Sequence, residues 1–131
     1  MFNKKKQPAI KSLIAQDCQL EGHFTFADGL RLDGSLKGNI LGSPERPSIL
    51  VISETASVTG EVQADHIILN GTVNGPVHAR VMLELQPKAR INGDVIYKAL
   101  EMHQGALVDG RLCPKLEAEE KPTLKLAANN Q

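Results

Sequence analysis

One five-residue pattern organises this chain, and two of its copies are Val73-Asn74-Gly75-Pro76-Val77 and Ile91-Asn92-Gly93-Asp94-Val95. Each copy reads aliphatic, polar, Gly, variable, aliphatic. The other four copies are Leu20-Glu21-Gly22-His23-Phe24, Leu36-Lys37-Gly38-Asn39-Ile40, Val58-Thr59-Gly60-Glu61-Val62 and Val108-Asp109-Gly110-Arg111-Leu112. Because their glycines are 15 to 22 residues apart, the chain consists of six structural units of about 17 residues.

The positions around each glycine predict strands. The residues two before and two after every glycine are apolar, and the residue immediately before it is polar. This alternation has the period of a β-strand, whose side chains point to opposite faces in turn. The position four before glycine holds only small residues, namely Cys18, Gly34, Ala56, Gly71, Ala89 and Ala106. We expect this column to line a tight inward corner, with Cys18 acting as a small apolar residue.

The segments between the motifs also have strand character. They are residues 30–32, 49–52, 67–69, 81–85 and 100–102, and no helical period interrupts them. The sequence therefore predicts an all-β protein, a single-stranded parallel β-helix of about six turns stacked at about 4.8 Å per turn. The Pro-rich insertion at residues 43–48 adds a loop to one turn. A sandwich or barrel of short strands is the alternative, but hairpins do not require one residue class at one phase in every unit.

Composition limits the function. The 131 residues are enough for one domain, and 15 Lys plus Arg balance 15 Asp plus Glu. With three Phe, one Tyr and no Trp, the chain lacks stacking platforms for single-stranded nucleic acid or sugars, and we predict no nucleic-acid partner. We find neither a membrane-spanning apolar stretch nor a secretory signal, and therefore expect a cytoplasmic location.

The first 16 residues differ from the rest in charge, since they contain lysines and no acidic residue. We predict that residues 1–16 form a disordered basic tail, residues 17–114 the β-helix, and residues 115–131 a disordered C-terminal tail. Aromatic insertion at a lipid interface beside ammonium groups would bind an anionic membrane. The predicted membrane-binding residues are Met1, Phe2, Lys4, Lys5 and Lys6. Further along, Ile10, Leu13 and Ile14 have helical spacing and either dock onto the β-helix or contact lipid.

The sequence predicts no catalytic, cofactor-binding or metal-binding residue. The histidines His23, His66, His78 and His103 occupy different phases of the repeat, so they do not stack into a metal-binding ladder. Carboxylates fall on outward positions, where solvation is the default. No nucleophile accompanied by a base and no phosphate-binding glycine loop occurs.

The repeat resembles that of the bactofilins, polymer-forming cytoskeletal proteins of bacteria. The resemblance covers residues 1 to about 114, including the start Met1-Phe2-Asn3-Lys4-Lys5-Lys6 and phrases such as Leu69-Asn70-Gly71-Thr72-Val73-Asn74-Gly75. It implies a right-handed β-helix that assembles end to end, without nucleotide, into non-polar filaments. It also implies membrane association through the N-terminal tail, at the inner face of the cell membrane, and recruitment of cell-wall or other morphogenetic partners.

Two functions of different classes follow from a β-helix. The first is a self-assembling scaffold, because a solenoid without polar caps exposes backbone edges and an open apolar cross-section. The predicted polymer interface is Leu20, Phe24 and Phe26 in the first turn with Leu107, Val108 and Leu112 in the last. The alternative is an acyltransferase of the left-handed hexapeptide-repeat class. That class needs a strict 18-residue turn and a catalytic histidine, whereas the units here vary in length.

The two cysteines give an early test of the β-helix. Cys18 and Cys113 lie five repeats apart, about 24 Å along the axis at ~4.8 Å per turn, whereas a disulfide needs Cα atoms within about 7 Å. We expect monomeric protein on a non-reducing gel to show no intrachain bridge. Such a bridge would contradict the β-helix, whereas a bridge between chains would not.

Overall fold

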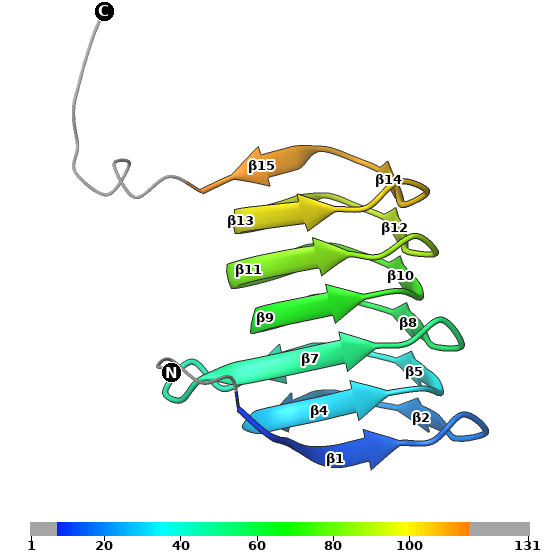
Figure 1. Cartoon of the computed structure of the whole chain (residues 1–131). Helices are drawn as coiled ribbons and strands as arrows, with labels where there is room; N and C mark the ends of the chain where they lie inside the picture. The colour runs from blue at the N-terminus through cyan, green and yellow to red at the C-terminus, as the bar shows by residue number, and fades with distance from the viewer. Residues whose placement is uncertain (1–7, 116–131) are drawn as a thin grey trace, which may run out of the picture.

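Every regular element within residues 8–115 is a strand (Figure 1). The computed structural model describes residues 8–115, and the predicted membrane-binding residues and the tail beyond residue 115 lie outside them. The described residues contain no helix, and hence no helix able to cross a lipid bilayer. The strands pair in parallel and stack as about six turns, which confirms the predicted β-helix.

The strands belong to two sheets, and each turn of the chain contributes to both. The nine-stranded sheet contains β1 (Ile10–Ile14), β3 (Phe24–Phe26), β4 (Asp28–Leu32), β6 (Ile40–Gly42), β7 (Ser48–Ile52), β9 (Val62–Leu69), β11 (Val77–Leu85), β13 (Val95–Met102) and β15 (Leu112–Pro114). The six-stranded sheet contains β2 (Gln19–Glu21), β5 (Ser35–Lys37), β8 (Ser57–Thr59), β10 (Thr72–Asn74), β12 (Arg90–Asn92) and β14 (Leu107–Asp109).

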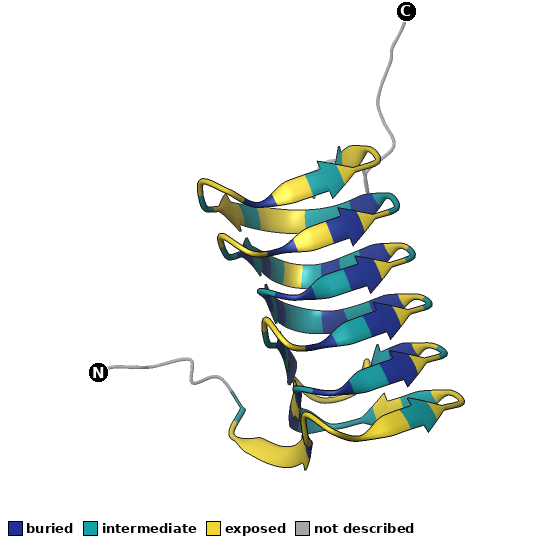
Figure 2. Ribbon diagram, turned by 90° about the vertical axis from the view of Figure 1, so that its right-hand side faces the viewer, coloured by how far each residue is buried: buried dark blue, intermediate teal, exposed yellow. Residues whose placement is uncertain are grey.

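The two aliphatic columns of the repeat form two ladders inside the stack. In the six-stranded sheet Leu20, Leu36, Val58, Val73, Ile91 and Val108 are register partners in successive turns. In the other sheet the register partners are Phe24, Ile40, Val62, Val77, Val95 and Leu112. The four central members of each ladder are at most 1% exposed. Figure 2 shows the same trend, with buried residues in the middle turns and exposed ones at both ends.

The repeated glycines form the bends that join the two sheets. All six have positive φ angles, from 128° at Gly22 to 159° at Gly110. At Gly75 the N–H donates to the carbonyl of Asn92 in the next turn, at 2.9 Å. A Cβ atom added at Gly75 would overlap the carbonyl oxygen of Gly60 in the turn before. Glycine is therefore required here both by the backbone angle and by the close stacking of the bends.

The small-residue column is buried as predicted except at Cys18. Ala56, Ala89 and Ala106 are at most 7% exposed, whereas the Cys18 thiol is free and exposed. At the inner members the preceding turn fills the space, since a Cβ at Gly34 would overlap the carbonyl oxygens of Ala15 and Cys18. Cys18 belongs to the first turn, and no earlier turn within residues 8–115 covers it. The prediction that it acts as an inward apolar residue is wrong.

The β-stack begins earlier than residue 17. Residues 10–14, predicted to belong to the tail and to have helical spacing, form strand β1, which pairs in parallel with β4. Ile14 is 9% exposed and belongs to the core, and the N–H of Asp33 donates to its carbonyl at 2.8 Å. Docking onto the β-helix, one of the two alternatives for this segment, is therefore what the structure shows.

The Pro-rich insertion is fastened to the stack by a buried polar network. The N–H of Ser48 donates to Asp65 Oδ2 at 3.2 Å, and Ser48 Oγ accepts from the N–H of Asp65 at 3.0 Å. Asp65 Oδ1 in turn accepts from Arg80 Nε at 2.8 Å, and Arg80 also donates to the carbonyls of Gly42 and Ser43. Because Ser48 is fully buried, these bonds satisfy polar groups that would otherwise be costly to bury. The network fixes both ends of the insertion.

Candidate functional site

The C-terminal end of the stack presents unpaired strand edges. Strand β15 pairs only with Val95–Tyr97 of β13, so the second half of β13, Ala99–Met102, has a partner on one side only within residues 8–115. Strand β14 pairs with β12 and β15 with β13, and the described residues supply no strand beyond them. Such an edge can pair with a strand of another chain.

Exposed aliphatic side chains accompany these edges. Leu107 is 58% exposed, Met102 44% and Leu112 42%. Leu112 continues an inward-facing ladder and is exposed because no further turn of the described chain covers it. Val108, the last member of the other ladder, is partly buried against the core. Of the three residues predicted for this end, Leu107 and Leu112 are therefore exposed and Val108 is less accessible.

The N-terminal end is only partly covered. Strand β1 covers β4, whereas among the described residues β2 pairs only with β5 and β3 only with β6. The predicted interface residues Leu20, Phe24 and Phe26 lie at this end, partly buried and packed against the core. The largest exposed apolar side chains here are instead Leu13, at 60%, and Ile10, at 46%.

At the ends of the stack the structure adds three exposed apolar residues that the repeat did not reveal. They are Ile10, Leu13 and Met102, and all three lie outside the five-residue motif. Ile10 and Leu13 belong to a strand that has no glycine anchor. Met102 could have been found by aligning the segments after the motif, since it is the register partner of the buried Leu85.

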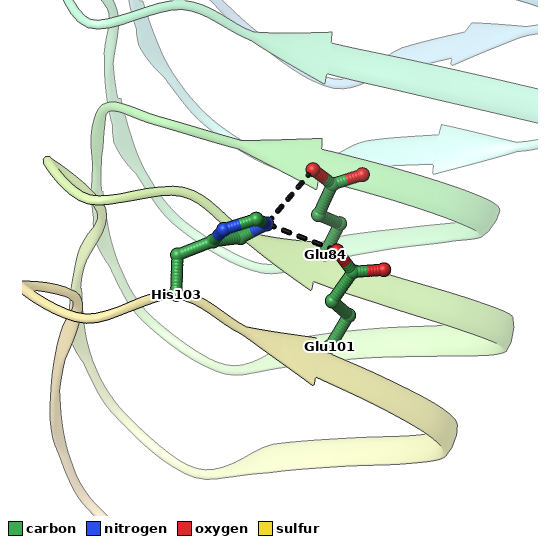
Figure 3. A group of neighbouring side chains, drawn as sticks. All are labelled: Glu84, Glu101 and His103. Carbon is green, nitrogen blue, oxygen red and sulfur yellow. Dashed lines mark hydrogen bonds and ion pairs between the residues drawn. The ribbon is translucent and has the colours of Figure 1, made fainter.

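A polar cluster lies on the outer surface near the C-terminal end (Figure 3). Glu84 on β11 and Glu101 on β13 are register partners, and His103 directly follows β13. His103 Nε2 lies 3.2 Å from Glu84 Oε2 and 3.1 Å from Glu101 Oε2. Each of the three residues offers one possible metal-ligand atom, and these three atoms lie within 4.8 Å of one another. The repeat phases of the histidines alone could not reveal this group, because its other members are carboxylates.

The other histidines do not join such a group. His78 Nδ1 lies 2.8 Å from Gln63 Nε2 on the neighbouring strand, and His66 Nδ1 is buried with no hydrogen-bond partner among the described residues. Burial lowers the pKa of His78 from its ordinary value of 6.5, and the charges of Lys115 and Arg80 lower it further. The neutral imidazole therefore accepts a hydrogen bond from the Gln63 amide.

The lowered pKa of His78 predicts a loss of stability in acid. As the pH falls, His78 takes up a proton near pH 6.5 in the unfolded chain but only at a lower pH in the folded chain. Protonation therefore favours the unfolded chain, and the free energy of unfolding falls as the pH drops from about 6.5 through the lower pKa of the folded state. We expect the melting temperature of the native chain to fall more between pH 7.5 and 5.5 than that of His78→Gln. Circular dichroism melts of both proteins measure this difference. An equal fall in both would show that His78 does not contribute.

A surface hollow near the N-terminal end of the stack contains no histidine. It has a volume of about 610 Å³ and lies along the six-stranded sheet. Its lining comprises Gln19, Leu20, Glu21, Ser35, Leu36, Lys37, Ser57 and Thr59. This lining contains no histidine, the residue that the acyltransferase alternative requires.

Comparison with known proteins identifies a family for most of the described chain. A family model described as "Bactofilin: Polymer-forming cytoskeletal" matches residues 12–113, which is most of the stack. No curated protein and no solved structure matches the chain.

Proposed function

Because this chain belongs to the bactofilin family of polymer-forming cytoskeletal proteins, we propose that it polymerises by stacking its β-helices end to end. The observation that carries the proposal is that each end of the stack combines strand edges unpaired among the described residues with exposed aliphatic side chains. The most exposed of these aliphatic side chains are Leu13 at the N-terminal end and Leu107 at the C-terminal end. Burying one such side chain stabilises a contact by roughly 1.5–3 kcal/mol.

We further propose that assembly needs no nucleotide. A phosphate-binding loop uses free backbone N–H groups of glycine-rich segments. Five of the six repeat glycines donate their N–H groups to the next turn, as the bonds from Gly38 to Thr59 and from Gly60 to Asn74 illustrate. This occupation of the glycine N–H groups supports assembly without nucleotide.

Electron microscopy of the full chain tests this assembly. We expect negatively stained protein in nucleotide-free, magnesium-free buffer to form filaments, and added ATP or GTP to leave their length and number unchanged. Filaments that require a nucleotide would contradict nucleotide independence. Monodisperse particles under all conditions would contradict end-to-end polymerisation.

We propose that the filaments attach to the inner face of the cell membrane through Met1, Phe2, Lys4, Lys5 and Lys6, and recruit cell-wall or other morphogenetic partners there. Each lysine near an anionic surface contributes about 1 kcal/mol. Many such weak anchors on one filament act together, which raises the overall avidity.

Deleting residues 2–7 should release the protein from membranes without affecting folding or polymerisation. The deleted residues precede β1, so the paired strands remain intact. Cosedimentation with vesicles containing phosphatidylserine measures the release, and vesicles of neutral phosphatidylcholine are the control. A matched variant with Lys4, Lys5 and Lys6 replaced by Gln separates charge from the aromatic contribution of Phe2. If the truncated chain sediments with anionic vesicles as well as the full chain, the anchor lies elsewhere, and the exposed residues Ile10 and Leu13 are next to be tested.

A further inference from the structure

We propose that Glu84, Glu101 and His103 form a binding site for a divalent transition-metal ion such as Zn²⁺ on the outer surface of the β-helix. The site lies beside the C-terminal end, since Glu101 belongs to the second half of β13, which within residues 8–115 has a partner on one side only, but its proposed metal binding does not depend on the polymerisation proposed above. It joins two successive turns, because Glu84 lies on β11 whereas Glu101 and His103 belong to the next turn (Figure 3).

The distances between the donor atoms suit one ion. Zinc lies about 2.0–2.2 Å from histidine nitrogen and carboxylate oxygen. Two such ligands are then about 3.0 Å apart in octahedral and about 3.4 Å apart in tetrahedral geometry. The observed separations from His103 Nε2 are 3.2 Å to Glu84 Oε2 and 3.1 Å to Glu101 Oε2, between those two values. The Glu84 and Glu101 oxygens lie within 4.8 Å of each other, so coordination of one ion by all three donors needs the two carboxylates to close around it.

The backbone holds the donors in place without the ion. Glu84 and Glu101 are register partners on paired strands, and the N–H of His103 donates to the carbonyl of Leu85 at 2.9 Å. The Glu84 carboxylate is also oriented by Gln86, whose Nε2 donates to Glu84 Oε2 at 3.2 Å. Ligands on rigid elements with a supporting hydrogen bond are the arrangement that metal sites require.

The charges of the group also favour a cation. Two carboxylates directly opposite each other on neighbouring strands repel. A cation between them removes this repulsion, and the imidazole of His103 adds a nitrogen ligand. One nitrogen with two carboxylates suits zinc and its neighbours in the transition series, whereas magnesium and calcium prefer oxygen ligands alone. Because the three side chains are 26% to 53% exposed, a coordination position would remain open to water.

Calorimetric titration with ZnCl₂ at pH 7.5 tests the site in the full chain. The cysteines Cys18 and Cys113 are free and should both be replaced by Ser, so that thiols cannot bind the metal. We expect saturable binding of one Zn²⁺ per chain. His103→Ala should weaken binding at least tenfold, and Glu101→Gln should weaken it severalfold. His23→Ala, at an exposed histidine outside the group, is the matched control and should bind as the parent does.

Cobalt gives a second readout that does not depend on heat. Co²⁺ bound to the site should produce visible absorption that Zn²⁺ displaces and that is lost in His103→Ala. Circular dichroism confirms that each variant is folded, and the exposure of His103 and Glu101 leaves the core intact. Binding that is unchanged in His103→Ala, the absence of binding up to 1 mM Zn²⁺, or equal affinity for Mg²⁺ and Zn²⁺ would each overturn the proposal.

Discussion

Leu112→Arg should abolish filament formation while leaving the β-helix folded. Leu112 ends an inward-facing ladder and is 42% exposed, so in the free chain an arginine at this position can extend its charge into water. In a filament the same charge would be covered by the next molecule. Removing one unpaired ion from water costs several kcal/mol, and each 1.4 kcal/mol is tenfold in affinity. We therefore expect the concentration needed for assembly to rise at least a hundredfold.

Val81→Arg is the matched control for this experiment. Val81 is also 42% exposed, but it lies on β11 in the body of the stack, away from both ends. The two variants introduce the same charge at aliphatic residues of equal exposure. End-to-end stacking predicts filaments for Val81→Arg and none for Leu112→Arg under the electron microscope. The reverse result would place the contact on the side of the β-helix.

The size of the Leu112→Arg particles reports the polarity of the filament. In head-to-tail assembly every junction joins a C-terminal end to an N-terminal end, so every junction would contain the new arginine and the variant should be monomeric. Like-end assembly leaves the N-terminal ends free to pair, so the variant should be dimeric. At the N-terminal end, Leu13→Arg is a cleaner test than Phe24→Arg, because Leu13 is 60% exposed whereas Phe24 packs against the core. Filaments from both end variants, each folded and monodisperse beforehand, would contradict end stacking.

The sequence predicted the interior of this protein better than its surface and ends. The two ladders follow from the repeat because stacking places the same residue class at the same phase in every turn, as in Val58 and Val73. Strand β1 has no repeat glycine, and its pairing with β4 depends on tertiary packing that the spacing of its apolar residues does not indicate. Apolar residues spaced i, i+3, i+4 fit a helix in isolation, yet Ile14 is buried as part of a strand.

The same limit explains which site residues were missed. Burial at the ends depends on whether another turn covers a residue, so Cys18 is exposed although its counterparts in later turns are buried. The Glu84, Glu101 and His103 group needs the register between two strands and the path of the chain after β13. Aligning whole turns would have paired Glu84 with Glu101. It would not have placed the His103 ring between them, because that position depends on the corner after the strand.

Gly75→Ala should destabilise the β-helix severely. The new Cβ would overlap the carbonyl of Gly60, and its nearest contacts are backbone atoms, which cannot move without shifting the turn below. The φ angle of 150° adds strain for any residue with a side chain. Together these effects should lower the free energy of unfolding by roughly 3–5 kcal/mol, at the upper end for single substitutions. Because the N–H of Gly75 also donates to Asn92, a shift of this bend would disturb the turn above as well.

Gly22→Ala separates the overlap from the backbone strain. Gly22 has the same kind of bend, with φ at 128°, but a Cβ there would have no atom within 4 Å because Gly22 belongs to the first turn. Its replacement should cost only the strain of the backbone angle, about 1–3 kcal/mol. Each substitution should be made separately in the Leu112→Arg chain, which is expected not to assemble, so that filaments do not interfere. Urea unfolding monitored by circular dichroism then measures the difference between the two losses of stability. Equal losses at the two positions would mean that the bends owe their glycines to the φ angle alone. A much larger loss at Gly75 would show that the close stacking of successive bends excludes every side chain.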